Sequence, residues 1–203
     1  MLTTLTPEII LEAYRIGIFP MASSADDPHF NFYRPEQRGL LPIKDIHIPK
    51  SLAKVIKQNV YEIRINTAFA DIIDGCAMTS EDEKQGRDKT WINAPIRDVF
   101  IQLHHMGYAH SVECWKEGKL AGGLYGLAIG AVFCGESMVS FEKNASKVAL
   151  AHLAQRLERK EFTILDTQFI NDHLIQFGAY EIPQEAYENA IKTEMQKPRT
   201  FTD

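Results

Sequence analysis

Residues 109–140 contain three consecutive runs with the composition of β-strands, and this feature most constrains the fold. The runs cover residues 109–115, 120–129 and 131–140, separated by a tight turn at 116–119 and a glycine-bearing turn at Gly130. Turns this short join antiparallel neighbours, whereas parallel strands need a crossover of a dozen or more residues. We therefore predict a three-stranded antiparallel meander.

Segments with helical or strand periodicity flank this meander on both sides. Residues 93–107 carry apolar side chains at i, i+3, i+4 and i+7, which indicates an amphipathic helix, and residues 146–160 are predicted as a second helix with one apolar face. The remaining predicted elements are helices at 7–17, 49–59, 67–78, 171–177 and 184–197, strands at 61–65, 162–166 and 180–182, and a polar loop at 79–89.

The order helix, three antiparallel strands, helix, strand, helix and strand predicts an α+β fold. This order is typical of an acyltransferase domain of the Gcn5-related N-acetyltransferase (GNAT) type, with a mixed, mostly antiparallel sheet and flanking helices. A chain of 203 residues with 45% apolar residues can bury the core of such a domain. We expect a small N-terminal subdomain at residues 1–60 and a GNAT-like catalytic domain at 61–203.

Three strongly polar residues, Glu136, Asp166 and Gln168, interrupt strands that otherwise look built for burial. Burying such groups is costly unless they are paired or used. Asp166 and Gln168 are two residues apart, so they project from the same face of a strand and could together orient an attacking amine. The alternative is structural, because Asp166 could instead accept hydrogen bonds from backbone N–H groups near the strand end. Spacing alone leaves both interpretations open.

A set of apolar residues from neighbouring strands and the following helix surrounds these polar positions. They could line a pocket for an apolar side chain or form the core, and periodicity does not separate the two. The set consists of Leu124, Phe133, Met138, Leu150, Leu153 and Leu165.

Several kinds of chemistry lack their sequence motif in this chain. There is no Walker phosphate loop, no Gly-x-Gly-x-x-Gly after a first strand, no His-Glu-x-x-His and no Gly-x-Ser-x-Gly. The three cysteines are odd in number and far apart, which argues against a disulfide framework or a zinc site. Residues 141–147 also lack the glycine-rich loop that binds the pyrophosphate of coenzyme A. We expect no metal, no cofactor and an acyl donor other than acyl-coenzyme A.

The net charge of −5 argues against a protein that grips long nucleic acid through many phosphates. A local basic patch is nevertheless predicted, because Lys50, Lys54 and Lys57 fall on one face of the helix at 49–59. A solvated lysine face is equally common. Residues 1–7 lack a secretory signal, and no apolar run is long enough to span a membrane, so we expect a cytoplasmic protein.

Seven segments together resemble the bacterial leucyl/phenylalanyl-tRNA-protein transferase family over most of the chain. The three segments between residues 133 and 173, in this order and spacing, are the most specific. The segments are AYRIGIFP (residues 13–20), TWI (90–92), GYAHSVE (107–113), GGLYG (122–126), FCGESM (133–138), NASK (144–147) and DTQ with NDH (166–168 and 171–173).

The resemblance implies transfer of Leu or Phe from aminoacyl-tRNA to the α-amino group of an acceptor protein, creating an N-end rule degradation signal. It implies that Glu136 and Gln168 hold the aminoacyl amino group and that Asp166 tunes Gln168. The apolar set would be the Leu or Phe pocket, with Gly135 and Asn171 also binding substrate, and Trp91 would stack on the terminal adenosine. The lysine face would contact the tRNA acceptor stem.

The resemblance has departures, and two rival functions remain open. Met21 follows the Ile-Phe-Pro sequence where many relatives have tryptophan, and residues 32–35 read Phe-Tyr-Arg-Pro where they have Trp-Trp-Ser-Pro. The first rival is an acyl-coenzyme A-dependent N-acetyltransferase, and the second is a non-catalytic module that binds a tRNA acceptor end. We expect a monomer. The sequence does not decide between basic and acidic acceptor N-termini, or how Leu, Phe and Met rank as donors.

Overall fold

The computed structural model describes residues 5–78 and 90–203 of the chain. Its described helices are α1 (Pro7–Arg15), α2 (Lys50–Lys57), α3 (Phe69–Ala77), α5 (Ala94–His105), α6 (Ala145–Arg159), α7 (Asp172–Ile175) and α8 (Gln184–Glu194). Its described strands are β1 (Phe19–Met21), β2 (Asn31–Tyr33), β3 (Gln37–Leu41), β4 (Glu62–Ile65), β5 (Ala109–Lys116), β6 (Lys119–Ile129), β7 (Val132–Ser140), β8 (Ile164–Gln168) and β9 (Tyr180–Pro183). The polar loop predicted at 79–89 lies outside the described residues.

The predicted antiparallel meander is confirmed. β5 pairs with β6, and β6 with β7, in antiparallel register. In the described residues these strands belong to a seven-stranded sheet with the order β4-β5-β6-β7-β8-β3-β9, and β1 and β2 form a separate two-stranded sheet. The β7–β8 pair is parallel, while the other strand pairs among the described residues are antiparallel. The expectation of a mixed, mostly antiparallel α+β fold is therefore correct.

Strands β1, β2 and β3 were not expected from the sequence, which predicts no element between the first helix and residue 49. β3 lies between β8 and β9 in the large sheet, so this part of the first 60 residues shares a sheet with the second predicted domain. Strand β3 contains Arg38 and Gly39, and because a charged residue and a glycine are uncommon in a buried strand, its sequence does not predict a strand. The domain boundary at residue 60 stays a prediction.

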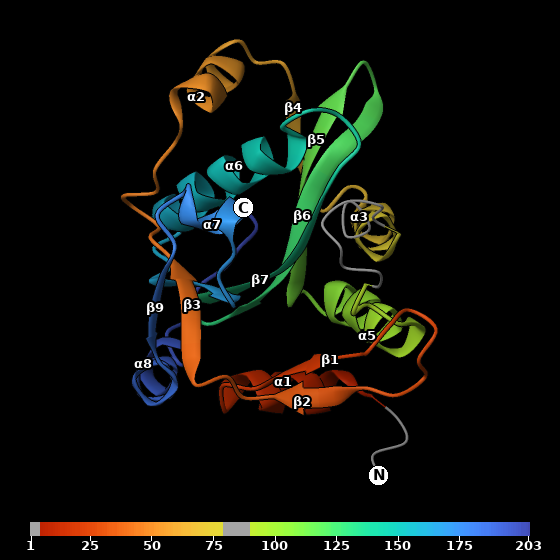
Figure 1. Cartoon of the computed structure of the whole chain (residues 1–203), viewed down its shortest axis with the longest axis vertical. Helices are drawn as coiled ribbons and strands as arrows, with labels where there is room; N and C mark the ends of the chain where they lie inside the picture. Colours follow the sequence, from red (N-terminus) through yellow and green to blue (C-terminus); the bar gives the residue numbers. More distant parts are fainter. Residues whose placement is uncertain (1–4, 79–89) are drawn as a thin grey trace.

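Two apolar clusters lie between the sheet and its helices, and Figure 1 shows helices on both faces of the sheet. Helix α6 packs on one face, where α2 and α7 also contribute, and its buried side chains include Leu150 and Leu153. Helices α3 and α5 pack on the other face, joined by residues of α1 and α8. Of the helices described, none is both long and apolar enough to cross a membrane.

Local sequence explains where the helices begin. Thr6 precedes Pro7 and caps α1 by accepting a hydrogen bond from the Ile9 N–H, and Asn93 caps α5 in the same way through Ile96. Glu113, a buried strand residue, accepts hydrogen bonds from the backbone N–H groups of Thr67 and Ala68 at the start of α3. These caps fix the helices that pack against the sheet.

Candidate active site

The candidate site lies where strands β7 and β8 stop pairing. Their parallel register runs from Val132 opposite Ile164 to Cys134 opposite Asp166, after which β7 continues to Ser140. A Cβ atom added to Gly135 would have only the Asp166 carbonyl oxygen within 4 Å, at 3.5 Å. The end of the pairing therefore leaves room beside Gly135.

Glu136 is placed at this opening by a β-bulge. The register between β6 and β7 pairs Tyr125 with Ser137 and Gly126 with Gly135, so Glu136 is the extra residue. Its Oε1 atom accepts a hydrogen bond of 2.7 Å from the Tyr14 hydroxyl and one of 3.4 Å from Gln168 Nε2. Among the described residues no donor reaches Oε2. One carboxylate oxygen is therefore held by the protein and the other remains able to bind a ligand.

Burial raises the pKa of Glu136 to about 8, while the hydrogen bond from Tyr14 opposes this rise. The hydroxyl of Tyr125, on the neighbouring strand, is fully buried and has no hydrogen-bond partner among the described residues. Burial and then the charge of Glu136 raise the pKa of Tyr125 well above its ordinary value. The partly buried Glu136 therefore accepts a hydrogen bond from one buried tyrosine and acts electrostatically on a second, and an amino group would be a favourable partner for its carboxylate.

Gln168 ends β8 in an unusual backbone conformation. Its φ of +58° lies in the left-handed region, which a non-glycine residue seldom adopts. The Asp166 carboxylate holds this turn, because Oδ1 accepts a hydrogen bond of 2.9 Å from the Gln168 backbone N–H. The strained turn directs the buried Gln168 amide across the opening toward Glu136.

Asp166 has no exposed surface and is surrounded by donors. Arg38 donates from Nε to Oδ1 at 2.8 Å and from Nη2 to Oδ2 at 2.6 Å, and the Tyr187 hydroxyl donates to Oδ2 at 2.8 Å. Arg38 is equally buried and also donates to the Gly17 carbonyl at 2.9 Å. With both oxygens engaged, Asp166 reaches a substrate only through Gln168.

Of the two interpretations of Asp166 left open by its spacing, the structure shows the backbone hydrogen bond of the structural one, and the role in orienting an amine stays a prediction. Asp166 does bind a backbone N–H at the strand end, as the structural alternative expects, and that N–H belongs to Gln168. The two residues do not project side by side into a cleft, because the left-handed turn at Gln168 breaks the strand geometry. Asp166 supports Gln168 from behind.

Sequence reasoning missed four residues of this arrangement: Tyr14, Arg38, Tyr125 and Tyr187. Tyr14 and Tyr125 lie in segments that resemble the family, but the sequence predicts no site role for them, for Arg38 or for Tyr187. A fully buried arginine needs a buried acid, and the only available signal was the equally costly Asp166. The two lie 128 residues apart in the chain, so no spacing rule joins them.

The apolar set predicted as a pocket or core lies in the cluster beneath α6. Leu124, Phe133, Leu150, Leu153 and Leu165 are buried, and Met138 is the partly exposed member. Leu165 faces this cluster, while the next residue, Asp166, faces Arg38 and Tyr187 on the other side of the sheet. The set therefore lies in a buried apolar cluster that reaches the surface at Met138, two residues from Glu136.

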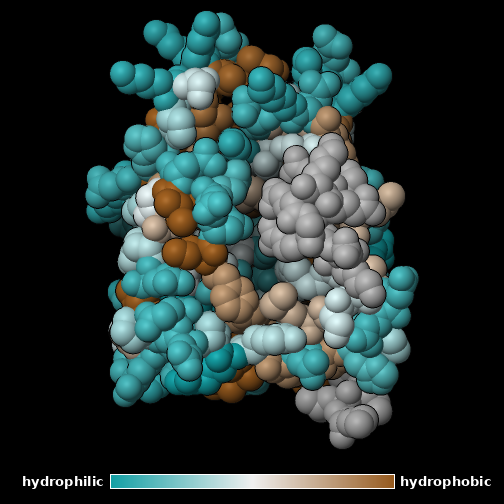
Figure 2. Space-filling view, in the orientation of Figure 1, coloured by the Kyte–Doolittle hydropathy of each residue, from teal (hydrophilic) through white to brown (hydrophobic). Residues whose placement is uncertain are grey.

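The remaining predicted site residues come from separate parts of the structure. Trp91 is half-buried, and its carbonyl accepts a hydrogen bond of 3.1 Å from the Ala22 N–H, next to Met21 of β1. Asn171 is exposed and caps α7 by accepting from the Leu174 N–H at 2.9 Å. The three lysines of α2, Lys50, Lys54 and Lys57, are all exposed, where hydrophilic side chains gather on the surface (Figure 2), and the opposite side of the helix carries the buried Leu52.

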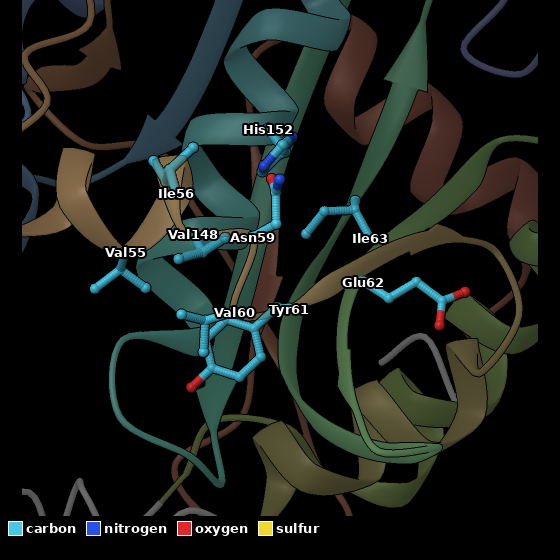
Figure 3. Close-up of a pocket in the computed structure, with 9 residues that line it drawn as sticks. All are labelled: Val55, Ile56, Asn59, Val60, Tyr61, Glu62, Ile63, Val148 and His152. Atoms are coloured by element: carbon cyan, nitrogen blue, oxygen red, sulfur yellow. The ribbon is translucent and has the colours of Figure 1, made fainter.

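A cavity of about 420 Å³ lies elsewhere, between α2, β4 and α6 (Figure 3). Val55, Ile56 and Val148 contribute apolar walls, and His152 contributes an imidazole. None of the residues predicted for the site lines this cavity. The described residues also contain no group of three or more His, Cys, Asp or Glu side chains that could hold a metal ion.

Comparisons with known proteins agree with these motifs. The family model described as leucyl/phenylalanyl-tRNA protein transferase matches residues 40–192, and the model for the N-terminal domain of that family matches residues 3–36. A solved structure described as L-PGS from Bacillus licheniformis is similar over 83% of this chain and 55% of that chain, with 14% identity and a TM-score of 0.40. The chain thus spans little more than half the length of that structure, and the likeness is too weak to carry an argument.

Proposed function

Because the chain belongs to the leucyl/phenylalanyl-tRNA protein transferase family, we propose that it is an aminoacyltransferase that moves Leu or Phe from aminoacyl-tRNA to a protein N-terminus. The observation that carries this proposal is the Glu136–Gln168 pair across the end of the β7–β8 pairing. The acceptor is a protein with N-terminal Arg or Lys, and the product carries an N-end rule degradation signal.

The carboxylate of Glu136 binds the α-amino group of the donor amino acid through Oε2. Tyr14 and Gln168 already donate to Oε1, so they fix the direction of the carboxylate without competing for Oε2. An ammonium group bound there lowers the pKa of Glu136 from its high value of about 8 and keeps the carboxylate charged. Glu136 thereby orients the ester for attack.

The reaction is aminolysis of an ester. The uncharged acceptor amine attacks the ester carbonyl carbon, and a C–N bond forms as the C–O bond to the ribose of the terminal adenosine breaks. The amine proton passes to the departing ribose oxygen, so the products are an amide and a free ribose hydroxyl. An aminoacyl ester is already activated, and holding the two reactants together supplies much of the rate. Gln168 positions these groups, and Asp166 and Arg38 hold Gln168 in place.

The other predicted contacts complete the donor site. The apolar cluster beneath α6 receives the Leu or Phe side chain past Met138, Trp91 stacks on the terminal adenosine, and Gly135 and Asn171 contribute to binding. The α2 lysines contact acceptor-stem phosphates. The parallel β7–β8 pair that parts beside Gly135 supports a fold of the GNAT type. No metal, cofactor or second subunit is required by this scheme.

One assay tests the proposal against its rivals. The protein is incubated with Leu-tRNA and acetyl-coenzyme A, each carrying a different label, and a peptide that begins with Arg. Transfer of leucine supports the proposal. Transfer of acetyl indicates an N-acetyltransferase, and tRNA binding without transfer of either label indicates a binding module. Glu136→Ala, which leaves the Asp166–Arg38 pair intact, is expected to abolish leucine transfer.

A further inference from the structure

Two exposed aromatic residues, Phe169, which follows Gln168 in the chain, and Tyr33 of β2, each contact the buried Phe19, and together they are called the platform here. Phe169 is 46% exposed and Tyr33 is 39% exposed, although both are large apolar rings. The buried Phe19 ring supports both, contacting Phe169 edge-on at 5.5 Å between centroids and stacking on Tyr33 at 6.3 Å. Two surface rings are therefore held on one buried ring next to the candidate site.

The exposed position of Phe169 is built into the fold. Its backbone N–H donates to the Thr167 carbonyl at 2.6 Å, immediately after the left-handed turn at Gln168. A Cβ atom on Gly39 would lie 2.7 Å from the carbonyl carbon of Phe169, so strand β3 packs directly against this turn. Leaving a large ring in water forgoes the free energy of its burial, and such exposed apolar surface commonly marks a contact site.

The neighbouring surface is negatively charged. Residues 33–36 and 180–188 carry the carboxylates of Glu36, Glu181, Glu185 and Glu188. Two cations act on Glu188: Arg34, which pairs with it at 2.8 Å, and Lys192, so the acidic residues remain in excess. Glu188 lies near Tyr33, since it accepts hydrogen bonds of 2.8 and 3.0 Å from Arg34, the next residue after Tyr33. A surface of this sign repels tRNA phosphates and attracts a cation.

We propose that the platform of Phe169 and Tyr33 binds the basic side chain of the first residue of the acceptor protein through cation–π contacts. This inference rests on the proposed function. The acceptor amine must reach the ester held at Glu136 and Gln168, and the side chain of the same residue then lies near Phe169, the next residue in the chain. The flat face of Arg suits stacking on a ring, and the carboxylates around Glu188 add attraction.

Peptides that begin with Arg or with citrulline test the platform, because citrulline has the shape of Arg without its charge. With Leu-tRNA as the common donor, wild-type protein is expected to favour Arg over citrulline by roughly tenfold in kcat/KM. Phe169→Leu and Tyr33→Leu are each expected to reduce this ratio severalfold, while Phe169→Tyr retains it. The KM for Leu-tRNA should not change. Phe141→Leu is the control, since Phe141 is an exposed ring outside the platform.

The remaining outcomes separate the platform from the proposed function. Leucine transfer with an Arg-to-citrulline ratio unchanged in both leucine variants overturns the platform alone. A higher KM for Leu-tRNA in Phe169→Leu, with the peptide ratio intact, also overturns it and assigns the ring to the tRNA. If wild-type protein transfers leucine to neither peptide, the proposed function fails and the platform fails with it.

Discussion

Arg38 and Asp166 form a completely buried ion pair that joins the N-terminal part of the chain to the candidate site. Two nearly parallel hydrogen bonds connect the guanidinium of β3 to the carboxylate of β8, at 2.8 and 2.6 Å. Burial alone would lower the pKa of Arg38, but the charge of Asp166 raises it, so the guanidinium stays charged. Asp166 also accepts a hydrogen bond from the Gln168 backbone N–H, so the ion pair helps to fix the position of Gln168 in the site.

The first prediction concerns this ion pair. Arg38→Met should lower the free energy of unfolding by about 3–5 kcal/mol, because it leaves the Asp166 carboxylate buried without its partner. The double variant Arg38→Met with Asp166→Asn should recover part of this loss, since neither charge remains. Urea denaturation of the three proteins measures both changes. Equal stability of Arg38→Met and wild type would contradict the prediction.

The same ion pair decides what loss of transfer in Asp166→Ala would mean. If Asp166 acted only in catalysis, Asp166→Ala would abolish transfer and leave the fold intact. The structure instead predicts a destabilised protein, because removing the carboxylate leaves a buried guanidinium. Loss of transfer in Asp166→Ala is therefore poor evidence for a chemical role, and Gln168 offers the cleaner test.

The second prediction separates the Gln168 side chain from its backbone. Gln168→Gly should change the free energy of unfolding by less than about 1 kcal/mol, since relief of the left-handed conformation offsets the lost contact with Glu136. The same variant should lower kcat for leucine transfer by roughly 100-fold, because the positioning amide is gone. Gln168→Asn, which tolerates this backbone and retains an amide, should fall between.

Glu117→Gly is the matched control for this variant. Glu117 has a φ of +51° in the exposed turn between β5 and β6. Its replacement by glycine therefore relieves the same backbone conformation at a position away from the site. Its kcat should equal that of wild type. If Gln168→Gly also retained full kcat, the side chain of Gln168 would have no part in transfer.

The sequence predicts most of this fold but only part of the site, for physical reasons. Long elements such as α5, α6 and the strands of the meander have apolar residues with a period of 3.6 or 2. This pattern can be read within the element itself, without knowledge of its neighbours. Strand β3 has five residues and gains its stability from neighbours far along the chain. The Arg38–Asp166 pair likewise depends on tertiary structure, because the two residues lie 128 positions apart and no local pattern joins them.

Glu113 and Glu136 show the same limit within the site. Both are glutamates in otherwise apolar strands of the meander, and both belong to segments that resemble the family. Although burial would raise the pKa of Glu113, hydrogen bonds from Thr67 and its neighbours lower it, and this carboxylate is consumed in capping α3. Glu136 differs because it sits in a β-bulge, just beyond the point where β7 stops pairing with β8. One of its carboxylate oxygens therefore remains able to bind a ligand.

The third prediction follows from the high pKa of Glu136. The pKa of about 8 exceeds the ordinary value of 4.5, so between these pH values the folded state binds more protons than the unfolded state. This group therefore stabilises the fold less as the pH rises through that window. Glu136→Gln, which cannot ionise, should gain stability relative to wild type between pH 5 and pH 9, measured by urea denaturation. Glu158→Gln, an exposed control, should show no such trend.

Tyr14→Phe provides a second measure of the same group. The Tyr14 hydrogen bond lowers the pKa of Glu136, so its removal should raise that pKa further. If the carboxylate form binds the donor, the pH at which kcat/KM for Leu-tRNA reaches half its maximum should rise by roughly one unit. A pH profile unchanged in Tyr14→Phe would indicate that Glu136 does not control donor binding.

The fourth prediction concerns the exposed lysines of α2. Lys54 and Lys57 lie in the last turn, and Lys50 lies one turn before Lys54, on a face with no acidic partner among the described residues. If each contacts a phosphate, replacing Lys54 and Lys57 with Gln should reduce the slope of log K against log salt by about 1.5–2 for tRNA binding. Adding Lys50→Gln should reduce it by slightly less than one further unit.

Filter binding of Leu-tRNA over a salt series measures these slopes. Lys119→Gln with Lys192→Gln removes the same charge from the β5–β6 turn and from α8, so it controls for the change in net charge. An equal loss of slope in this control would show that the α2 lysines act only through overall charge. A loss confined to the α2 variants would place the acceptor stem along α2, away from the carboxylates around Glu188 that favour a basic acceptor.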